Sequence, residues 1–283
     1  MKIQSGKLST IKYFSLMLMF IGISKAFAQS SFLVEQKRYS RVRASISEKE
    51  QIILNKLNDN NINLNQLNIL IIAYKMESEF EIFAKKNTND TYKKLATYKI
   101  CSKSGDLGPK RKQGDGQVPE GFYYIERFNP SSSFYLSMGI NYPNQSDRIK
   151  SNARNLGGDI FIHGDCVTIG CLPMTDDKIK EIYLYAINAK SNGQQKIPVY
   201  IFPFRMSEQK FNYYKKEFQD NSKLIEFWTN IKLAYDKFDK QKKELKVSFT
   251  QSGDYIFDWT SIFFLKYFYV LLLTIVNLIN KWV

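Results

Sequence analysis

The sequence predicts a mostly β fold with one internal helix and helical segments at both ends. From residue 67 onward, short runs rich in Ile, Tyr, Phe and Thr alternate with turn residues, which is typical of strands. Helical periodicity follows the last cysteine and dominates residues 207–246. The loop SKSGDLGPKRKQGDGQVPE, residues 102–120, carries four glycines and two prolines and therefore interrupts the strands.

The elements are expected in the following order. Ser47 and Glu50 stand in capping-box spacing and predict a short helix at 47–58, after a linker at 29–46. Thr175 is a good N-cap, two aspartates follow it, and Gly193 comes after the last apolar position, so a helix is expected between them. Strands are predicted at 67–74, 80–86, 92–101, 121–126, 133–138, 159–163 and 197–202.

The chain divides into five parts by composition. Its 283 residues, 44% of them hydrophobic, suffice for one substantial domain with appendages. We expect a signal peptide at 1–28, a linker with a short helix at 29–66, the main domain at 67–204, a helical extension at 205–253 and an apolar tail at 254–283.

The first 28 residues have the pattern of a secretory signal. Three lysines precede the apolar run YFSLMLMFIGIS, and AFA at 26–28 is an A-x-A cleavage site before Gln29. An uncleaved N-terminal anchor is the alternative. Either arrangement places the remainder outside the cytosol, in the periplasm or elsewhere in the cell envelope.

The opposite end is apolar. SIFFLKYFYVLLLTIVNLI, residues 261–279, is long enough to cross a bilayer, although Lys266 would cost about 2.5–3.5 kcal/mol at its centre. We expect membrane contact through residues 256–283, either as an anchor or as a surface helix, with a functionless extension as the alternative.

Basic residues outnumber acidic ones. The balance of 41 Lys and Arg against 27 Asp and Glu gives a net charge of +14, which favours anionic partners such as lipid headgroups or acidic wall polymers. No nucleic-acid-binding motif accompanies the charge, so we expect no nucleic acid partner.

Three cysteines and one histidine carry the candidate chemistry. His163 ends the strand run DIFIH, and Cys171 follows eight residues later in TIGC, after Gly170. An odd number of cysteines leaves one thiol unpaired in an exported chain, and catalysis is a reason to keep it. We expect Cys171 to be a nucleophile and His163 its proton donor and acceptor, with the helix that starts at Thr175 favouring the thiolate.

The surroundings of this pair can complete a site. The backbone N–H groups of Gly170 and Cys171 are candidate oxyanion donors, and the Gly164 carbonyl can orient the imidazole. Two alternatives remain: a zinc site that uses His163 and all three cysteines, and a disulfide between Cys166 and Cys171. A disulfide between Cys101 and Cys166 would leave Cys171 free. We expect no metal and no cofactor.

The segment IHGDCVTIGCLPMTD resembles the active-site signature of YkuD-type L,D-transpeptidases, and most of all their YafK-like subgroup. The resemblance runs from about residue 67 to 238 and includes YKIC, GDLGPK, GDGQVPEGFY, NPSSSFYLSMGINYPNQSDR, FPFRM and FWTNIKLAYDKF. It implies a β-sandwich-like catalytic domain at 67–204 that acts on peptidoglycan stem peptides, with Cys171 as nucleophile, His163 as proton carrier and Thr168 as the supporting hydroxyl.

Two features depart from the broad family pattern. The interval from His163 to Cys171 is short, and Ile169 stands where a His or Arg is common, while Leu172, Pro173 and Met174 follow the cysteine. These changes lie around the acceptor side. The acceptor can therefore be a stem amine, which gives a cross-link, or a protein lysine, which gives an attachment. Water as acceptor would make the enzyme an amidase that releases a wall-linked protein or peptide. A catalytically decayed wall-binding protein is the remaining alternative.

Overall fold

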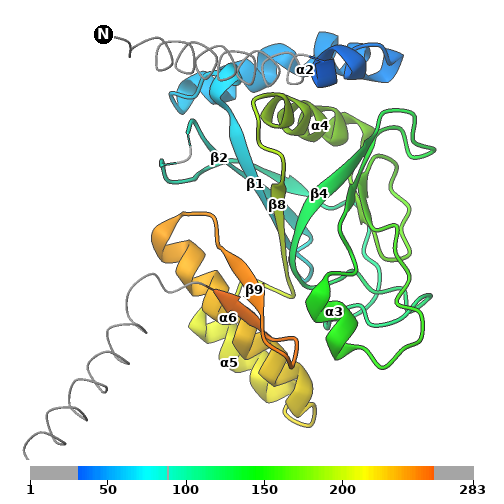
Figure 1. Ribbon diagram of the computed structural model, residues 1–283, viewed down its shortest axis with the longest axis vertical. Coiled ribbons are helices and arrows are strands. Elements are labelled where there is room, and N and C mark those ends of the chain that lie inside the picture. The colour runs from blue at the N-terminus through cyan, green and yellow to red at the C-terminus, as the bar shows by residue number, and fades with distance from the viewer. Residues whose placement is uncertain (1–30, 88, 258–283) are drawn as a thin grey trace, which may run out of the picture.

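The computed structural model of the protein describes residues 31–87 and 89–257 (Figure 1). The predicted signal peptide and residues 258–283 of the apolar tail lie outside this part of the chain. Among the described residues, no helix combines the length and the apolar character needed to cross a bilayer.

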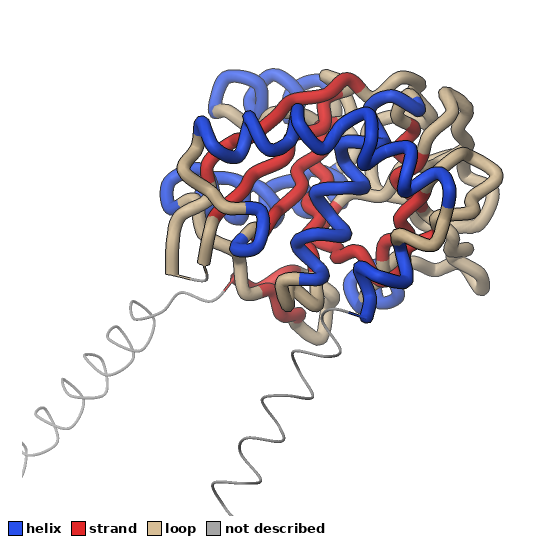
Figure 2. Tube along the Cα trace, turned by 90° about the horizontal axis from the view of Figure 1, so that it is seen from above, coloured by secondary structure: helices blue, strands red, loops and turns tan. Residues whose placement is uncertain are grey.

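An eight-stranded mixed sheet forms the centre of the fold, in the order β3-β2-β1-β8-β4-β5-β6-β7. Its curl is visible from above in Figure 2. The pairs β1–β8 and β6–β7 are parallel, and the other neighbours are antiparallel. The strands are β1 (Asn68–Tyr74), β2 (Glu79–Lys85), β3 (Lys93–Lys99), β4 (Gly121–Asn129), β5 (Ser137–Ile140), β6 (Phe161–His163), β7 (Leu172–Pro173) and β8 (Ile197–Phe202).

Helices cover both faces of the sheet, which explains why β1 is apolar throughout. Ile69 and Ile71 of β1 face one core, whereas Leu70 and Ile72 face the other. The first core is closed by α2 (Ser40–Asp59) and α4 (Asp176–Ser191), and the second by α5 (Glu208–Glu217) and α6 (Ser222–Gln241). The two helical layers lie on opposite sides of the sheet in Figure 1. The predicted mostly β domain with helical appendages is confirmed.

The helix near the N-terminus begins earlier than the sequence predicts. Residues 31–36 are already helical and α2 starts at Ser40, so Ser47 lies inside the helix instead of capping it, and residues 31–46 are not a linker. The buried stripe Val42, Ile53 and Leu57 packs into the first core and extends the helix past the capping-box signal. Lys56 pairs with Glu181 of α4 at 2.8 Å and ties the two helices together.

Two short segments also differ from the prediction. The strand expected at 133–138 begins only at Ser137, because residues before it form a turn in which Tyr135 has a φ of 65°. A 3-10 turn (η1, Leu64–Gln66) leads into β1, and a short helix, α3 (Gln145–Lys150), follows β5 with a capping box at Asn144.

The helical extension predicted at 205–253 is two helices followed by a hairpin. Asn221 caps α6 by accepting from the Leu224 N–H at 3.1 Å. Strands β9 (Val247–Phe249) and β10 (Tyr255–Phe257) then pair antiparallel, around the turn TQSGD. Tyr255 and Phe257 are buried in the second core, so the fold extends beyond the boundary that the sequence predicts at residue 253.

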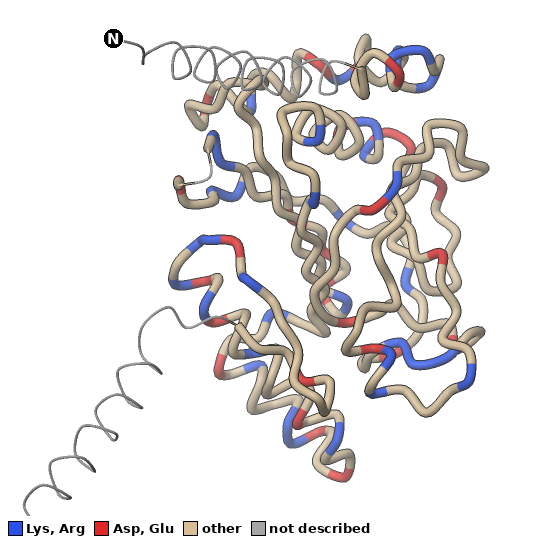
Figure 3. Tube along the Cα trace, viewed as in Figure 1, with Lys and Arg blue, Asp and Glu red and all other residues tan. Residues whose placement is uncertain are grey.

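Charged residues of both signs are interspersed along the chain in Figure 3. Many of them form ion pairs between elements, such as Arg205 with Glu81 at 2.8 Å and Arg111 with Asp147 at 2.9 Å.

Candidate active site

Two adjacent parallel strands carry the histidine and the free cysteine. Ile162 of β6 pairs with Leu172 of β7, and His163 pairs with Pro173. Cys171 immediately precedes β7 and therefore lies opposite Phe161, two residues along β6 from His163. The pairing brings the two candidate residues to one edge of the sheet.

The imidazole is buried and held by its own strand. The exposed fraction of His163 is 1%, its Nδ1 lies within hydrogen-bonding distance of the Gly164 carbonyl, and its ring packs against Phe134 with centroids 4.7 Å apart. Burial lowers the pKa of His163. The ring is therefore neutral at pH 7, and a proton on Nδ1, donated to Gly164, leaves Nε2 with a free lone pair.

The thiol of Cys171 has two backbone partners on the preceding segment. Its Sγ accepts from the Phe161 N–H at 3.4 Å and donates to the Asp159 carbonyl at 3.6 Å. Burial raises the pKa of the thiol, and the Phe161 N–H opposes that rise. The prediction that the helix starting at Thr175 favours the thiolate finds no support in this direction of shift.

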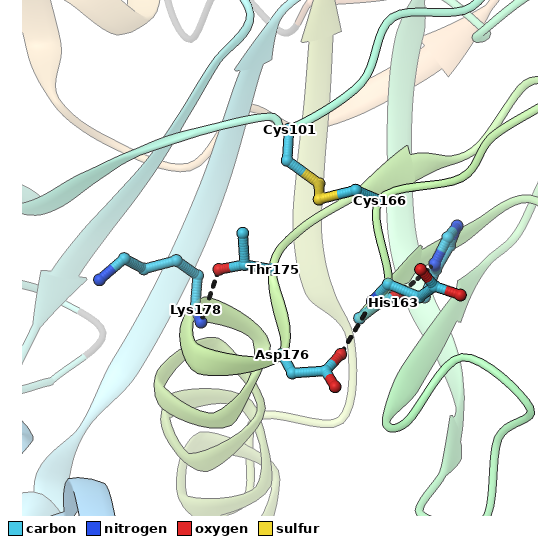
Figure 4. The surroundings of a disulfide bond; sticks show 8 residues. Cys101, His163, Cys166, Thr175, Asp176 and Lys178 are labelled. Atoms are coloured by element: carbon cyan, nitrogen blue, oxygen red, sulfur yellow. Dashed lines mark hydrogen bonds between the residues drawn. A yellow bond between two sulfur atoms is a disulfide. The ribbon is translucent and has the colours of Figure 1, made fainter.

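The side chains of His163 and Cys171 have different hydrogen-bond partners. No hydrogen bond joins His163 to Cys171 in the described part of the chain. The first turn of α4 holds the loop before the thiol instead, because Asp176 Oδ1 accepts from the Asp165 N–H at 2.9 Å. Thr175 caps α4 as predicted, accepting from the Lys178 N–H at 3.3 Å (Figure 4).

Thr168 organises the turn that carries the thiol. Its Oγ1 accepts from the Cys171 N–H at 2.9 Å and the Gly170 N–H at 3.2 Å, and it donates to the Cys171 carbonyl at 3.0 Å. Both candidate oxyanion donors are thus directed at this hydroxyl in the resting structure. Gly170 has a φ of 127°, and a Cβ there would lie 2.9 Å from the Gln117 carbonyl oxygen, so the turn requires glycine.

A disulfide joins Cys101 and Cys166, with Cα atoms 5.5 Å apart, and leaves Cys171 free. It links the end of β3 to the loop between His163 and Cys171 (Figure 4). The pairing is possible because the Cys101 N–H donates to the Pro173 carbonyl at 3.0 Å, which brings residue 101 beside β7. The two bonded sulfurs cannot serve as zinc ligands, and a Cys166–Cys171 bridge is excluded in this state.

A pocket of about 560 Å³ opens beside Cys171. Its size is that of a small-molecule or peptide-fragment site. The loop at 102–120 lines it through residues such as Ser104 and Leu107. Tyr213 and Tyr214 of α5 also line the pocket.

The contribution of α5 is absent from the sequence prediction. The sequence predicts a separate helical extension at 205–253, and the amphipathic pattern of this extension shows only that one of its faces is buried. Only packing of α5 over the second core brings its last turn beside the thiol. The Phe161 N–H and the Asp159 carbonyl, as backbone groups, also leave no signal in the sequence.

A buried imidazole on one strand and a free thiol on the next, in a groove at the edge of a curled sheet, match a known class of enzyme domain. Residues 77–201 match the model of the YkuD family, the L,D-transpeptidase catalytic domain, and the chain belongs to that family. "Putative L,D-transpeptidase YafK" of Escherichia coli strain K12 is 37% identical over 190 residues, which cover 66% of this chain and 73% of that protein. The protein of the same name from Escherichia coli O157:H7 gives the same figures.

Solved structures show a weaker likeness. The helical cell shape determining protein Pgp2 of Campylobacter jejuni overlaps with a TM-score of 0.39 at 16% identity, over 72% of this chain and 81% of that one. Bd1075 of Bdellovibrio bacteriovorus gives a TM-score of 0.35 at 23% identity, over 56% of each chain. Overlaps this low carry no argument about function.

Proposed function

We propose that the protein is a cell-envelope L,D-transpeptidase-like enzyme that acts on peptidoglycan stem peptides through a thioester on Cys171. The observation that carries the proposal is a free thiol in the wall of a peptide-sized pocket, one strand away from the only histidine of a chain that belongs to this family.

Acylation begins with removal of the thiol proton. Because Nδ1 of His163 faces the Gly164 carbonyl, Nε2 is the atom that takes this proton. The sulfur adds to the stem-peptide carbonyl, the carbon–nitrogen bond breaks, and the imidazolium returns the proton to the leaving amine. The product is a thioester between Cys171 and the stem peptide.

Substrate binding must bring the pair into contact. Catalytic hydrogen bonds are often long in free enzymes and tighten in the complex. Rotation of the Cys171 side chain away from the Asp159 carbonyl, or one intervening water, brings the proton to Nε2. In the same step, the N–H groups of Gly170 and Cys171 exchange the Thr168 hydroxyl for the developing oxyanion. Thr168 holds both donors in place until then.

The thioester is resolved by whichever nucleophile arrives. An amine of a second stem peptide gives a cross-link, and a protein lysine gives an attachment. Water gives hydrolysis, which would make the protein an amidase that releases a wall-linked protein or peptide. The His163 imidazole accepts the proton of the incoming nucleophile in each case.

The disulfide supports an extracytosolic location of the site. A disulfide beside the nucleophile persists in an oxidising environment, and this supports export to the periplasm or cell envelope by the predicted signal at 1–28. Attachment to the membrane by the apolar segment at 261–279 is part of the proposal, since residues 256 and 257 belong to β10.

The test is Cys171→Ala, checked by thermal melting and incubated with purified muropeptides. We expect no product from the variant and a stable adduct on Cys171 when the parent protein meets a carbapenem. Full activity of Cys171→Ala refutes the mechanism, and an unreactive Cys171 with wall binding intact indicates a decayed binding protein. Mass spectrometry of the products distinguishes new cross-links from released peptides.

A further inference from the structure

The pocket beside Cys171 has one wall that lies outside the matched catalytic domain. The family match ends at residue 201, whereas Tyr213, Tyr214, Glu217 and Phe218 come from α5 and the residue after it. The rest of the lining includes the loop at 102–107 and the turn between β1 and β2.

The pocket is apolar inside and charged at its edge. Apolar side chains dominate its lining, namely Met76, Ile100, Leu107, Val118, Leu172 and Phe218. Three exposed charged residues, Lys103, Asp106 and Glu217, also line it. A ligand that fits must therefore present a hydrocarbon segment and end in charged groups.

Some of the charged side chains at the pocket edge have a partner in the protein, and others do not. Lys103 Nζ donates to the Met76 carbonyl at 2.9 Å. Glu217 and Asp106 have no ion-pair or hydrogen-bond partner within residues 31–87 and 89–257. Nearby Glu77, by contrast, is neutralised by Lys210. Two unpaired carboxylates at the edge of an apolar pocket attract a cationic group.

We propose that Glu217 is a specificity-determining residue that binds the ammonium group at the far end of the diamino acid side chain of the acyl donor. The inference rests on the proposed function. The family resemblance implies a stem-peptide donor with a diaminopimelate-type residue, whose side chain offers methylene groups for the apolar lining, then an ammonium and a carboxylate at its end. Glu217 meets the ammonium, and Lys103 meets the carboxylate.

The test compares Glu217→Gln with Glu226→Gln, an exposed carboxylate on α6 that does not line the pocket. For a stem tetrapeptide donor with a free side-chain amine, we expect Glu217→Gln to raise KM roughly five- to tenfold, with kcat little changed and Glu226→Gln unaffected. Acetylation of the donor's side-chain amine should raise KM similarly for the parent enzyme and have little further effect on Glu217→Gln. Equal KM values for parent and Glu217→Gln with the free-amine donor overturn the inference.

A carbapenem, which carries no diamino acid side chain, separates this inference from the proposed function. Its rate of acylation of Cys171 should be the same in Glu217→Gln and the parent. If Cys171 is acylated and the donor is turned over, but Glu217→Gln has the same KM as the parent, only the role of Glu217 is refuted. Absence of both acylation and turnover in the parent refutes the proposed function.

Discussion

Replacing Glu120 with Gln should destabilise the protein and loosen the pocket wall. Glu120 is fully buried and accepts from Lys75 at 3.0 Å, from the Gly108 N–H at 2.7 Å and from Trp228 Nε1 at 2.9 Å. Lys75 also donates to the Gly108 and Val118 carbonyls, at 2.7 and 3.0 Å. One ion pair thus joins β1, α6 and the glycine-rich loop beside the thiol.

The magnitude follows from burial. The side chains of Lys75 and Glu120 are 7% and 0% exposed, so Glu120→Gln leaves an ammonium buried without its counterion. Breaking a buried pair by removing one partner costs about 3–5 kcal/mol. For a domain of this size, each kcal/mol lowers Tm by about 2–4 °C, so the expected fall is roughly 6–20 °C.

Differential scanning calorimetry and urea unfolding measure the effect, with Glu48→Gln as the control. Glu48 pairs with Lys180 at 2.6 Å, but its side chain is 50% exposed, so its loss should cost less than about 1 kcal/mol. If the free energy of unfolding of Glu120→Gln, like that of Glu48→Gln, lies within about 1 kcal/mol of the parent, the reasoning from burial is refuted.

Three further outcomes test the site and its surroundings. Because burial raises the pKa of the Cys171 thiol, the rate of its alkylation by iodoacetamide should keep rising with pH beyond the range of a free thiol; a plateau from pH 6 to 7, measured by mass spectrometry, would instead show a preformed thiolate. Gly170→Ala, in which the new Cβ meets the Gln117 carbonyl at 2.9 Å and φ is 127°, should lose carbapenem acylation at least about tenfold and destabilise the fold by about 1–3 kcal/mol; unchanged acylation contradicts the required turn geometry. A chain ending at Phe257 keeps β10 and should be released from membranes without detergent, whereas the full-length chain should need it; equal release of both argues against membrane attachment.

Much of the fold could be predicted because its signals are local. The runs LNILIIAY and IPVYIF became β1 and β8 almost to the residue, and Thr175 caps α4 as its sequence context indicates. The stripe Phe227, Ile231, Tyr235 and Phe238 faces the second core, as helical periodicity predicts. Each of these depends on residues within a few positions of one another.

The remainder depends on contacts between distant segments. The Cys101–Cys166 bridge spans 65 residues and needs residue 101 beside β7, which no spacing rule provides. The sequence does not predict the hairpin β9–β10, because its short strands follow a long helical pattern. The sequence predicts the ionisation of Cys171 from its neighbours along the chain, whereas burial, which raises the pKa of the thiol, depends on distant segments.

The position of α5 bears on how inhibitors of this protein should be sought. A fragment cut at the limits of the matched domain would keep the nucleophile but lack the part of its pocket that α5 lines, and it would expose Tyr200 and Phe122, which α6 and the hairpin otherwise cover. Compounds selected on such a fragment would be fitted to a surface that the whole protein does not present. Screening therefore requires the chain through Phe257.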